Sequence, residues 1–223
     1  MPAEPAAPAA RDLADLPYAH RLAPFSGELG REGDHEHAHF DGRGFAGVDG
    51  GSTVFVECAL TSVTFDGGRY RRARFDDVWT HQVRWVGADL AETDWTDCEA
   101  GAGLLAGVEL FGARLRRVTF HHCKFDSVNL RAAELRDVAF VDCLLRDVDF
   151  GGARFKGVSF PGTTLERVRF DNVTVDRADL SGAASLGIAS GLEALRGATI
   201  SGLQLVELAP ALAEMAGLRV TDG

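Results

Sequence analysis

The sequence has few cysteines, prolines and tyrosines, and it contains no long hydrophobic run. No apolar stretch approaches the ~18 residues that span a bilayer, and the first residues lack the basic start and apolar core of a signal peptide. These absences exclude membrane insertion and favour a cytoplasmic location. The four cysteines (Cys58, Cys98, Cys123 and Cys143) stand at positions otherwise held by Val or Ala, and they are expected to be buried and reduced.

Motifs for catalysis are also missing. There is no nucleophile elbow, phosphate loop, dinucleotide fingerprint or helical zinc signature, so neither an enzyme nor a bound cofactor is expected. His35, His37 and His39 alternate along one segment, and a shared side would let them hold zinc or nickel. The alternative is a polar strand that begins the fold.

What the sequence does contain is a period of five residues. From Phe40 to Leu180 every fifth residue is large and apolar, and only Gly50, Thr80 and Ala100 fail among 29 positions. A second set of smaller residues, mostly Val, Ala, Cys and Thr, occupies the position two residues before each large apolar residue. In an α-helix, side chains five positions apart point ~140° apart around the axis, and in a strand they point to opposite faces. Neither element therefore keeps every fifth residue on one face. Each unit must be a short segment plus a bend, which makes the chain a solenoid with both sets pointing inward.

Units such as Ala153-Arg154-Phe155-Lys156-Gly157 and Ala178-Asp179-Leu180-Ser181-Gly182 resemble the pentapeptide-repeat family. The resemblance implies an all-β solenoid, a right-handed four-sided parallel β-helix with about twenty residues in each coil. About seven to eight coils are expected over residues 38–200. Residues 1–37, rich in proline and alanine, are expected to be a largely disordered extension. Its larger side chains can pack on the first coil, namely Leu16, Tyr18, Leu22 and Phe25.

Residues 201–223 are expected to cap the C-terminal end. Ser201-Gly202-Leu203-Gln204 has the form of a capping box, and it opens a helix that Gly217 would end. Pro210 should kink or restart the helix, and a strand is expected at 218–220. The apolar surface of this helix exceeds what one coil can bury, and it includes Leu205, Leu208, Leu212 and Met215. A cap alone is one interpretation; a homodimer joined through the C-terminal ends, as in bacterial members that the chain resembles, is the prediction.

Charge is distributed unevenly over the predicted sides. The chain has 33 acidic and 23 basic residues, a net charge of −10, but residues 38–180 carry only 22 and 18. Because each coil is expected to contain about twenty residues, outward residues twenty positions apart are assigned to the same side of the rod. The side that includes Phe40, Phe120 and Phe160 has no outward base, and its acids are candidates for partner binding: Asp41, Glu99, Asp142 and Asp179.

A second side, which includes Phe75, Trp95 and Leu115, has acids early and bases late. The acids are Glu57, Asp76, Asp77, Asp94 and Asp97, and the bases are Arg114, Arg116, Arg117, Arg136, Arg154 and Lys156. Solvated strand surface with cross-coil ion pairs is one interpretation, and a partner site that includes Asp76, Asp77, Asp94 and Asp97 is the other.

Thr80 and Ala100 are small where the period requires a large residue, and they fall on adjacent coils of the cation-free side. The rod should narrow there unless a neighbour fills the space, and Trp79 is the candidate. The alternative is a partner-binding notch with Trp79 at its edge.

Several members of the family bind DNA gyrase, imitate duplex DNA and confer resistance to quinolones or other topoisomerase poisons. The resemblance implies a non-catalytic protein that binds gyrase or another type II topoisomerase, partly as a DNA mimic, without binding nucleic acid itself. Duplex DNA presents about 20 negative charges over the ~34 Å expected for the coils, against a net −4 here, so uniform mimicry is not expected. A scaffold or binding module unrelated to topoisomerases is the alternative.

Overall fold

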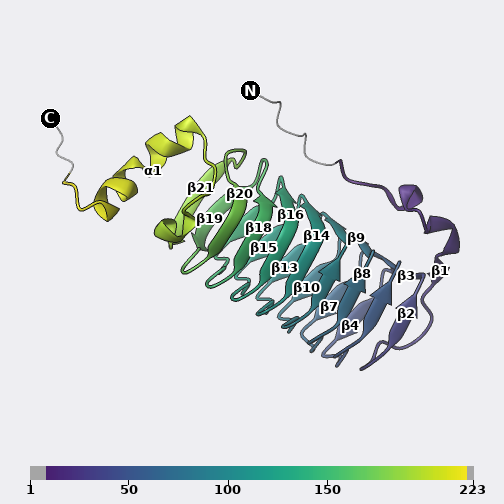
Figure 1. The fold of residues 1–223 in the computed structure, drawn as a ribbon. Helices are drawn as coiled ribbons and strands as arrows, with labels where there is room; N and C mark the ends of the chain where they lie inside the picture. Colours follow the sequence, from purple (N-terminus) through teal and green to yellow (C-terminus); the bar gives the residue numbers. More distant parts are fainter. Residues whose placement is uncertain (1–8, 220–223) are drawn as a thin grey trace.

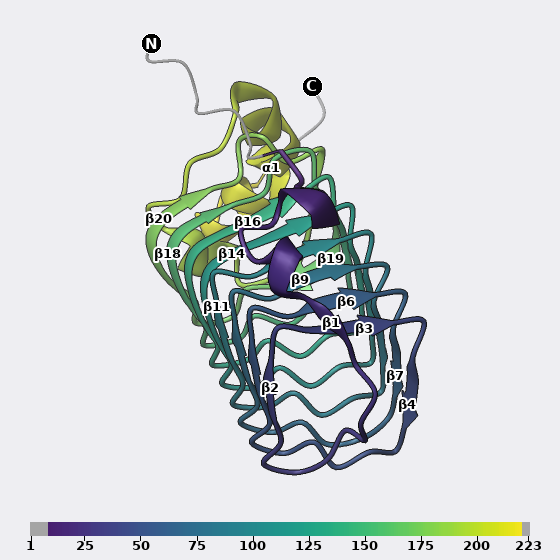
Figure 2. The ribbon, with the colours of Figure 1, turned by 90° about the vertical axis from the view of Figure 1, so that its right-hand side faces the viewer.

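The computed structural model describes residues 9–219, which form a rod of about eight stacked coils (Figure 1). Corresponding residues of successive coils are twenty positions apart, as in the pairing of Phe55 with Phe75. Seen from the N-terminal end, the chain turns clockwise as it recedes, so the solenoid is right-handed (Figure 2). The predicted four-sided parallel β-helix is confirmed. No helix of the described range is long and apolar enough to cross a membrane.

The four sides of the rod differ in how their strands are arranged. Side 1 contains β3 (Ala38–Asp41), β6 (Ala59–Thr61), β9 (Trp79–His81) and β12 (Glu99–Gly101). Side 2 contains β4 (Gly44–Ala46), β7 (Thr64–Asp66), β10 (Arg84–Val86), β13 (Leu104–Ala106), β15 (Lys124–Asp126), β17 (Leu144–Arg146), β19 (Thr164–Arg169) and β21 (Ser185–Ser190). Side 3 is held by isolated bridges such as Asp49 with Arg69. Side 4 contains β2 (Asp34–Glu36), β5 (Val54–Val56), β8 (Arg74–Asp76) and β11 (Asp94–Thr96). Later strands run from side 4 into side 1: β14 (Arg114–His121), β16 (Glu134–Val141), β18 (Arg154–Ser159) and β20 (Thr174–Asp179).

Each five-residue unit ends in a corner that has left-handed backbone. The corner residue lies two positions after the large apolar one, and it is often not glycine, as at Glu57 (φ 49°), Asp97 (φ 56°) and Arg117 (φ 53°). A single left-handed residue turns an extended chain without ending it, which aims the next, smaller residue inward. Cys98 and Val118 occupy that inward position, and both are buried.

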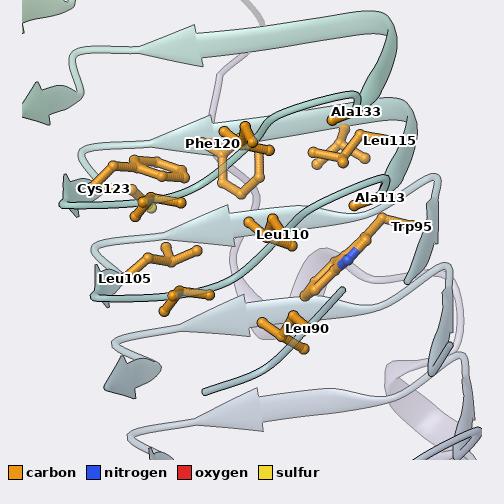
Figure 3. Packing of buried hydrophobic residues seen from close by; sticks show 14 of the residues in the cluster. Leu90, Trp95, Leu105, Leu110, Ala113, Leu115, Phe120, Cys123 and Ala133 are labelled. Carbon is orange, nitrogen blue, oxygen red and sulfur yellow. The ribbon is translucent and has the colours of Figure 1, made fainter. Parts of the chain in front are cut away.

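The large apolar side chains stack in columns along the axis. The ring centroids of Phe120 and Phe140 are 5.2 Å apart, and those of Phe140 and Phe160 are 5.3 Å apart. Figure 3 shows Trp95, Leu110 and Phe120 reaching the interior from different sides of the rod. The core is therefore one continuous column.

The N-terminal segment is more structured than predicted. It contains the short 3₁₀ helices η1 (Leu13–Asp15) and η2 (Ala19–Arg21), followed by β1 (Ala23–Pro24), which pairs with β3. The expected packing on the first coil occurs for Phe25, which stacks on Phe40 with centroids 4.1 Å apart. Tyr18 is fully buried but packs further along the rod, against Ala59 and Trp79 of the next two coils. This burial supplies the order that a Pro/Ala-rich composition did not predict. Residues 1–8 lie outside the described range.

The coils end in η3 (Leu192–Leu195) and the helix α1 (Gly202–Met215). The predicted capping box is present, and Nε2 of Gln204 also donates to the carbonyl oxygens of Leu180 at 2.8 Å and Ala183 at 3.2 Å. Gly217, at φ 71°, follows the helix as expected. Pro210 lies inside α1, which continues without a second start, so of the two expected effects the restart does not occur. Leu218 is not in a strand, contrary to expectation. Val220 lies outside the described residues.

Candidate functional site

The N-terminal segment crosses side 1 and covers residues predicted to bind a partner. We call residues 11–22 the strap; it lies along the rod in Figure 1. The backbone N–H of Arg11 donates to Oε1 of Glu99 at 2.7 Å, and its Nε donates to Oε2 at 2.6 Å. Glu99 is only 7% exposed. The prediction of a solvent-facing acid is therefore wrong for Glu99, because Arg11 neutralises it.

Trp79 lies on the outer surface of β9, beneath the strap. Its Nε1 donates to the carbonyl oxygen of Arg11 at 3.2 Å, and its ring belongs to a small apolar cluster with Leu16, Tyr18 and Ala59. The hydroxyl of Tyr18 donates to a carbonyl oxygen of the coil at 3.4 Å, and burial raises the pKa of this hydroxyl. Arg21 forms a second ion pair with Glu57, at 2.7 Å. The strap is thus held by two ion pairs and one aromatic cluster.

The small residues Thr80 and Ala100 do create a gap, but Trp79 does not fill it. A cavity of about 20 Å³ lies inside the rod beneath them, lined also by Trp85 and Trp95. That volume holds about one water molecule, and its apolar lining favours an empty space. Trp79 points outward instead, because it follows an inward residue and precedes the central one. The strap lies over the outer surface at this point, where a partner-binding notch was the alternative.

His121 is a further buried group near this contact. It is 3% exposed, and its Nε2 lies 3.8 Å from Oε1 of Glu99 without a hydrogen-bond partner in residues 9–219. Burial lowers the pKa of His121, while the carboxylate of Glu99 opposes that effect. His122 lowers this pKa further, and Asp142 raises it slightly. His121 thus lies beside the carboxylate that Arg11 binds, and its burial favours the uncharged imidazole.

Acidification is expected to loosen the strap. If release exposes His121, its pKa returns towards the ordinary 6.5, so protonation favours the released form. The docked form has its full stability above about pH 6.5. It loses stability as the pH falls from there towards the lowered pKa that His121 has in the docked form. The NMR signal of the Trp79 indole N–H measures docking directly. A His121→Gln variant should flatten the profile in this window, and an unchanged profile would contradict the assignment to His121.

The remaining acids of side 1 do not converge. Asp41 lies on the first coil and is exposed, and Asp142 is exposed five coils later. Asp179 is half-buried and accepts hydrogen bonds from the backbone N–H and hydroxyl of Ser181 at 2.8 and 2.6 Å. These acids offer separate points of charge along the rod.

Side 4 has a shallow groove of about 620 Å³, and its charges are partly paired across coils. Arg114 lies 3.1 Å from Asp94, and Arg117 lies 2.5 Å from Asp97, so two of the predicted acids are neutralised. Asp76 forms no ion pair with any residue of the described range. Burial raises the pKa of Asp77, although Arg11 opposes this rise. Asp76 and Asp77 are thus the unneutralised part of the acidic cluster.

The three alternating histidines do not share a side. His37 is a corner residue with φ 54°, and its Nε2 lies 2.6 Å from Glu57. His35 instead packs against the ring of Phe55, while His39 contacts a threonine hydroxyl at 3.0 Å. Within residues 9–219 no three His, Cys, Asp or Glu side chains are placed to hold a metal ion. The alternation fails because a corner interrupts the extended segment.

The cysteines are buried and free, as predicted. Burial raises the pKa of Cys58 to about 11 and that of Cys98 to about 12. These thiols stay protonated near neutral pH, and a protonated thiol is a poor nucleophile.

Helix α1 presents a second candidate surface at the end of the rod. Leu205 is 51% exposed and Met215 is 50% exposed, as the predicted dimer surface requires, and Leu212 is half-buried. Leu208 is buried within the protomer, so it is not available to a partner and is removed from that surface. Other apolar residues of this end are exposed as well, as expected for a helix with more apolar surface than one coil can bury: Leu203, Val206 and Leu218.

Arg11 and His121 were missed as parts of the site. The sequence held one indication of such a partner. The residues paired with Glu99 in the adjacent coils are Trp79 and Thr119, and neither is basic. A carboxylate without a cross-coil base needs a partner from elsewhere in the chain.

Comparisons with known proteins agree with the five-residue period. The family model described as a pentapeptide repeat region matches residues 93–170. Among solved structures, QnrB1, a plasmid-mediated fluoroquinolone resistance protein, is 18% identical with a TM-score of 0.46, over 89% of this chain and 96% of that chain. HetL, involved in heterocyst differentiation regulation in the cyanobacterium Nostoc sp. strain PCC 7120, is 16% identical with a TM-score of 0.26, over 76% and 90%. No protein with a curated description matches the sequence.

The matched segment covers the middle coils, from Thr93 to Phe170. The same twenty-residue pairing extends beyond it in both directions, from β2 to β20. Residues 93–170 are thus a pentapeptide repeat region, and the coils on either side continue its twenty-residue pairing.

Proposed function

We propose that this protein is a non-catalytic binding protein that engages a type II topoisomerase, such as DNA gyrase, in the cytoplasm and protects it from an antibiotic or toxin. Pentapeptide-repeat solenoids are generally structural or binding proteins. The columns of stacked rings fill the interior, so recognition must use the outer side chains. Those side chains stand on paired strands, which fixes their spacing before a partner arrives.

The observation that carries the choice of partner is the pair of unneutralised acids on side 4. Asp76 and Asp77 stand on one coil, and neither carboxylate is in an ion pair within residues 9–219, whereas Asp94 and Asp97 are paired. Arg74 and Arg116 line the same groove and also have no ion pair in that range. A protein that binds DNA presents lysine and arginine to phosphates, and fixed carboxylates attract the same surface. The mimicry proposed here is local, because cross-coil ion pairs cancel charge along the rest of this side.

A gyrase supercoiling assay with and without a fluoroquinolone tests this function. The wild-type protein should preserve supercoiling in the presence of the drug or inhibit the enzyme in its absence. Asp76→Asn with Asp77→Asn should weaken the effect, whereas Asp66→Asn with Asp126→Asn, the same change of charge on side 2, should not. Absence of both effects at micromolar protein would sink the topoisomerase proposal.

The alternative is a scaffold or binding module unrelated to topoisomerases. The ion pairs Arg114–Asp94 and Arg117–Asp97 favour it, since they leave much of side 4 close to neutral. Recovery of gyrase subunits with the tagged protein from its native cell would count decisively against this alternative.

A further inference from the structure

The strap lacks the backbone hydrogen bonds that join each coil to its neighbours. Within residues 11–22 the backbone hydrogen bonds are local, such as Asp15 N–H to Asp12 and Arg21 N–H to Tyr18. Backbone pairing with side 1 begins only at Ala23, whose N–H donates to the carbonyl of His37 at 2.9 Å. Release of the strap would therefore break side-chain contacts without opening the hydrogen bonds of any coil.

The surface beneath the strap is built by the coils themselves. Glu99 and Trp79 stand on β12 and β9, which pair with each other, and Ala59 stands on the next strand, β6. Their positions are set by strand pairing and do not require the strap. Together they offer a carboxylate, an indole N–H donor and an apolar slot. This combination fits an arginine, a peptide carbonyl and an aromatic ring that one peptide segment supplies.

The strap does not use every group of this surface. It satisfies both oxygens of Glu99 and the indole of Trp79, but Nε2 of His121 has no partner within residues 9–219. An unsatisfied buried polar atom weakens a contact, because its hydrogen bond to water has been lost without replacement. A segment that brings one more donor or acceptor to His121 would bind better than the strap.

We propose that side 1 is a peptide-binding surface that the strap occupies in cis, and that a partner protein binds there with a segment carrying an arginine followed by an aromatic residue. The strap then acts as a competing internal ligand. Its Arg11 and Tyr18 show the spacing that the surface accepts. This site is separate from Asp76 and Asp77, so it stands whether or not the partner is a topoisomerase.

The experiment uses the full chain and a fluorescein-labelled peptide of residues 10–26. Arg11→Glu with Tyr18→Ser weakens the strap, because it places like charge beside Glu99 and removes the buried ring. If the strap occupies the site at least nine-tenths of the time, the peptide should bind this variant about tenfold or more tightly than wild type. Adding Glu99→Gln should abolish that gain, and a peptide with Arg11→Glu should not bind.

The NMR signal of the Trp79 indole N–H reports the state of the strap in each variant. A shifted signal without peptide binding would overturn the proposal, since the surface would then be open and without affinity. An unshifted signal would overturn it as well, because the strap would not be exchangeable. Equal binding to the Glu99→Gln variant would show that the peptide binds elsewhere.

Discussion

Replacing Phe140 with alanine is expected to lower the free energy of unfolding by about 3–5 kcal/mol, the range for deleting a buried phenylalanine side chain. Phe140 is fully buried and stacks between Phe120 and Phe160. The surrounding coils are fixed by hydrogen bonds on both sides, so they cannot collapse onto the space. Urea denaturation monitored by circular dichroism measures the loss.

Phe111→Ala is the matched control, because Phe111 is 46% exposed at a corner. Its effect is expected to stay within about 0.5–1 kcal/mol, as for other exposed positions. Equal losses for Phe111→Ala and Phe140→Ala would contradict the stacked core.

The second large effect concerns assembly. We predict a homodimer joined through the C-terminal ends, because α1 leaves Leu205 and Met215 half exposed beside other apolar side chains. Leu205→Asp with Met215→Asp should weaken association by ~100-fold or more, since burying unpaired charge costs about 3 kcal/mol or more. Light scattering and sedimentation over a range of concentrations measure the change.

Phe111→Asp serves as the control for added charge, since Phe111 lies far from α1 along the rod. It should leave the dimer intact. Leu208→Asp is expected to act differently, through loss of the helix from its position, because Leu208 is buried within the protomer. A monomeric wild type, or a dimer indifferent to Leu205→Asp and Met215→Asp, would refute this arrangement.

The coils were predictable because each contact in them is short in sequence. Phe140 meets Phe120 and Phe160, twenty residues away on either side, so a period of five with four units in each coil specifies its neighbours. The five-residue period of large apolar residues weakens at Ser185 and Ser190, and the register of β21 explains why. Leu186 pairs with Leu165, an offset of 21 residues, so one extra residue shifts the period in β21.

The strap was not predictable in the same way. Arg11 meets Glu99 across 88 residues, and the N-terminal segment carries no repeat that assigns it to a side. Glu99 was placed on the outer side of the coils, where it stands, whereas Trp79, the candidate to fill the gap at Thr80 and Ala100, points outward instead. Their burial depends on a second layer, which the period does not encode.

The long separation between Arg11 and Glu99 also sets an order of events during synthesis. Coils form from neighbouring units, so the first of them can assemble while later ones are still being translated. The strap leaves the ribosome before any coil, yet its carboxylate partner emerges 88 residues later. Closure of the strap therefore follows completion of the coil that contains Glu99. A nascent chain interrupted before that point would lack the ion pair of Arg11, although the apolar cluster of Tyr18, Ala59 and Trp79 would already have been translated.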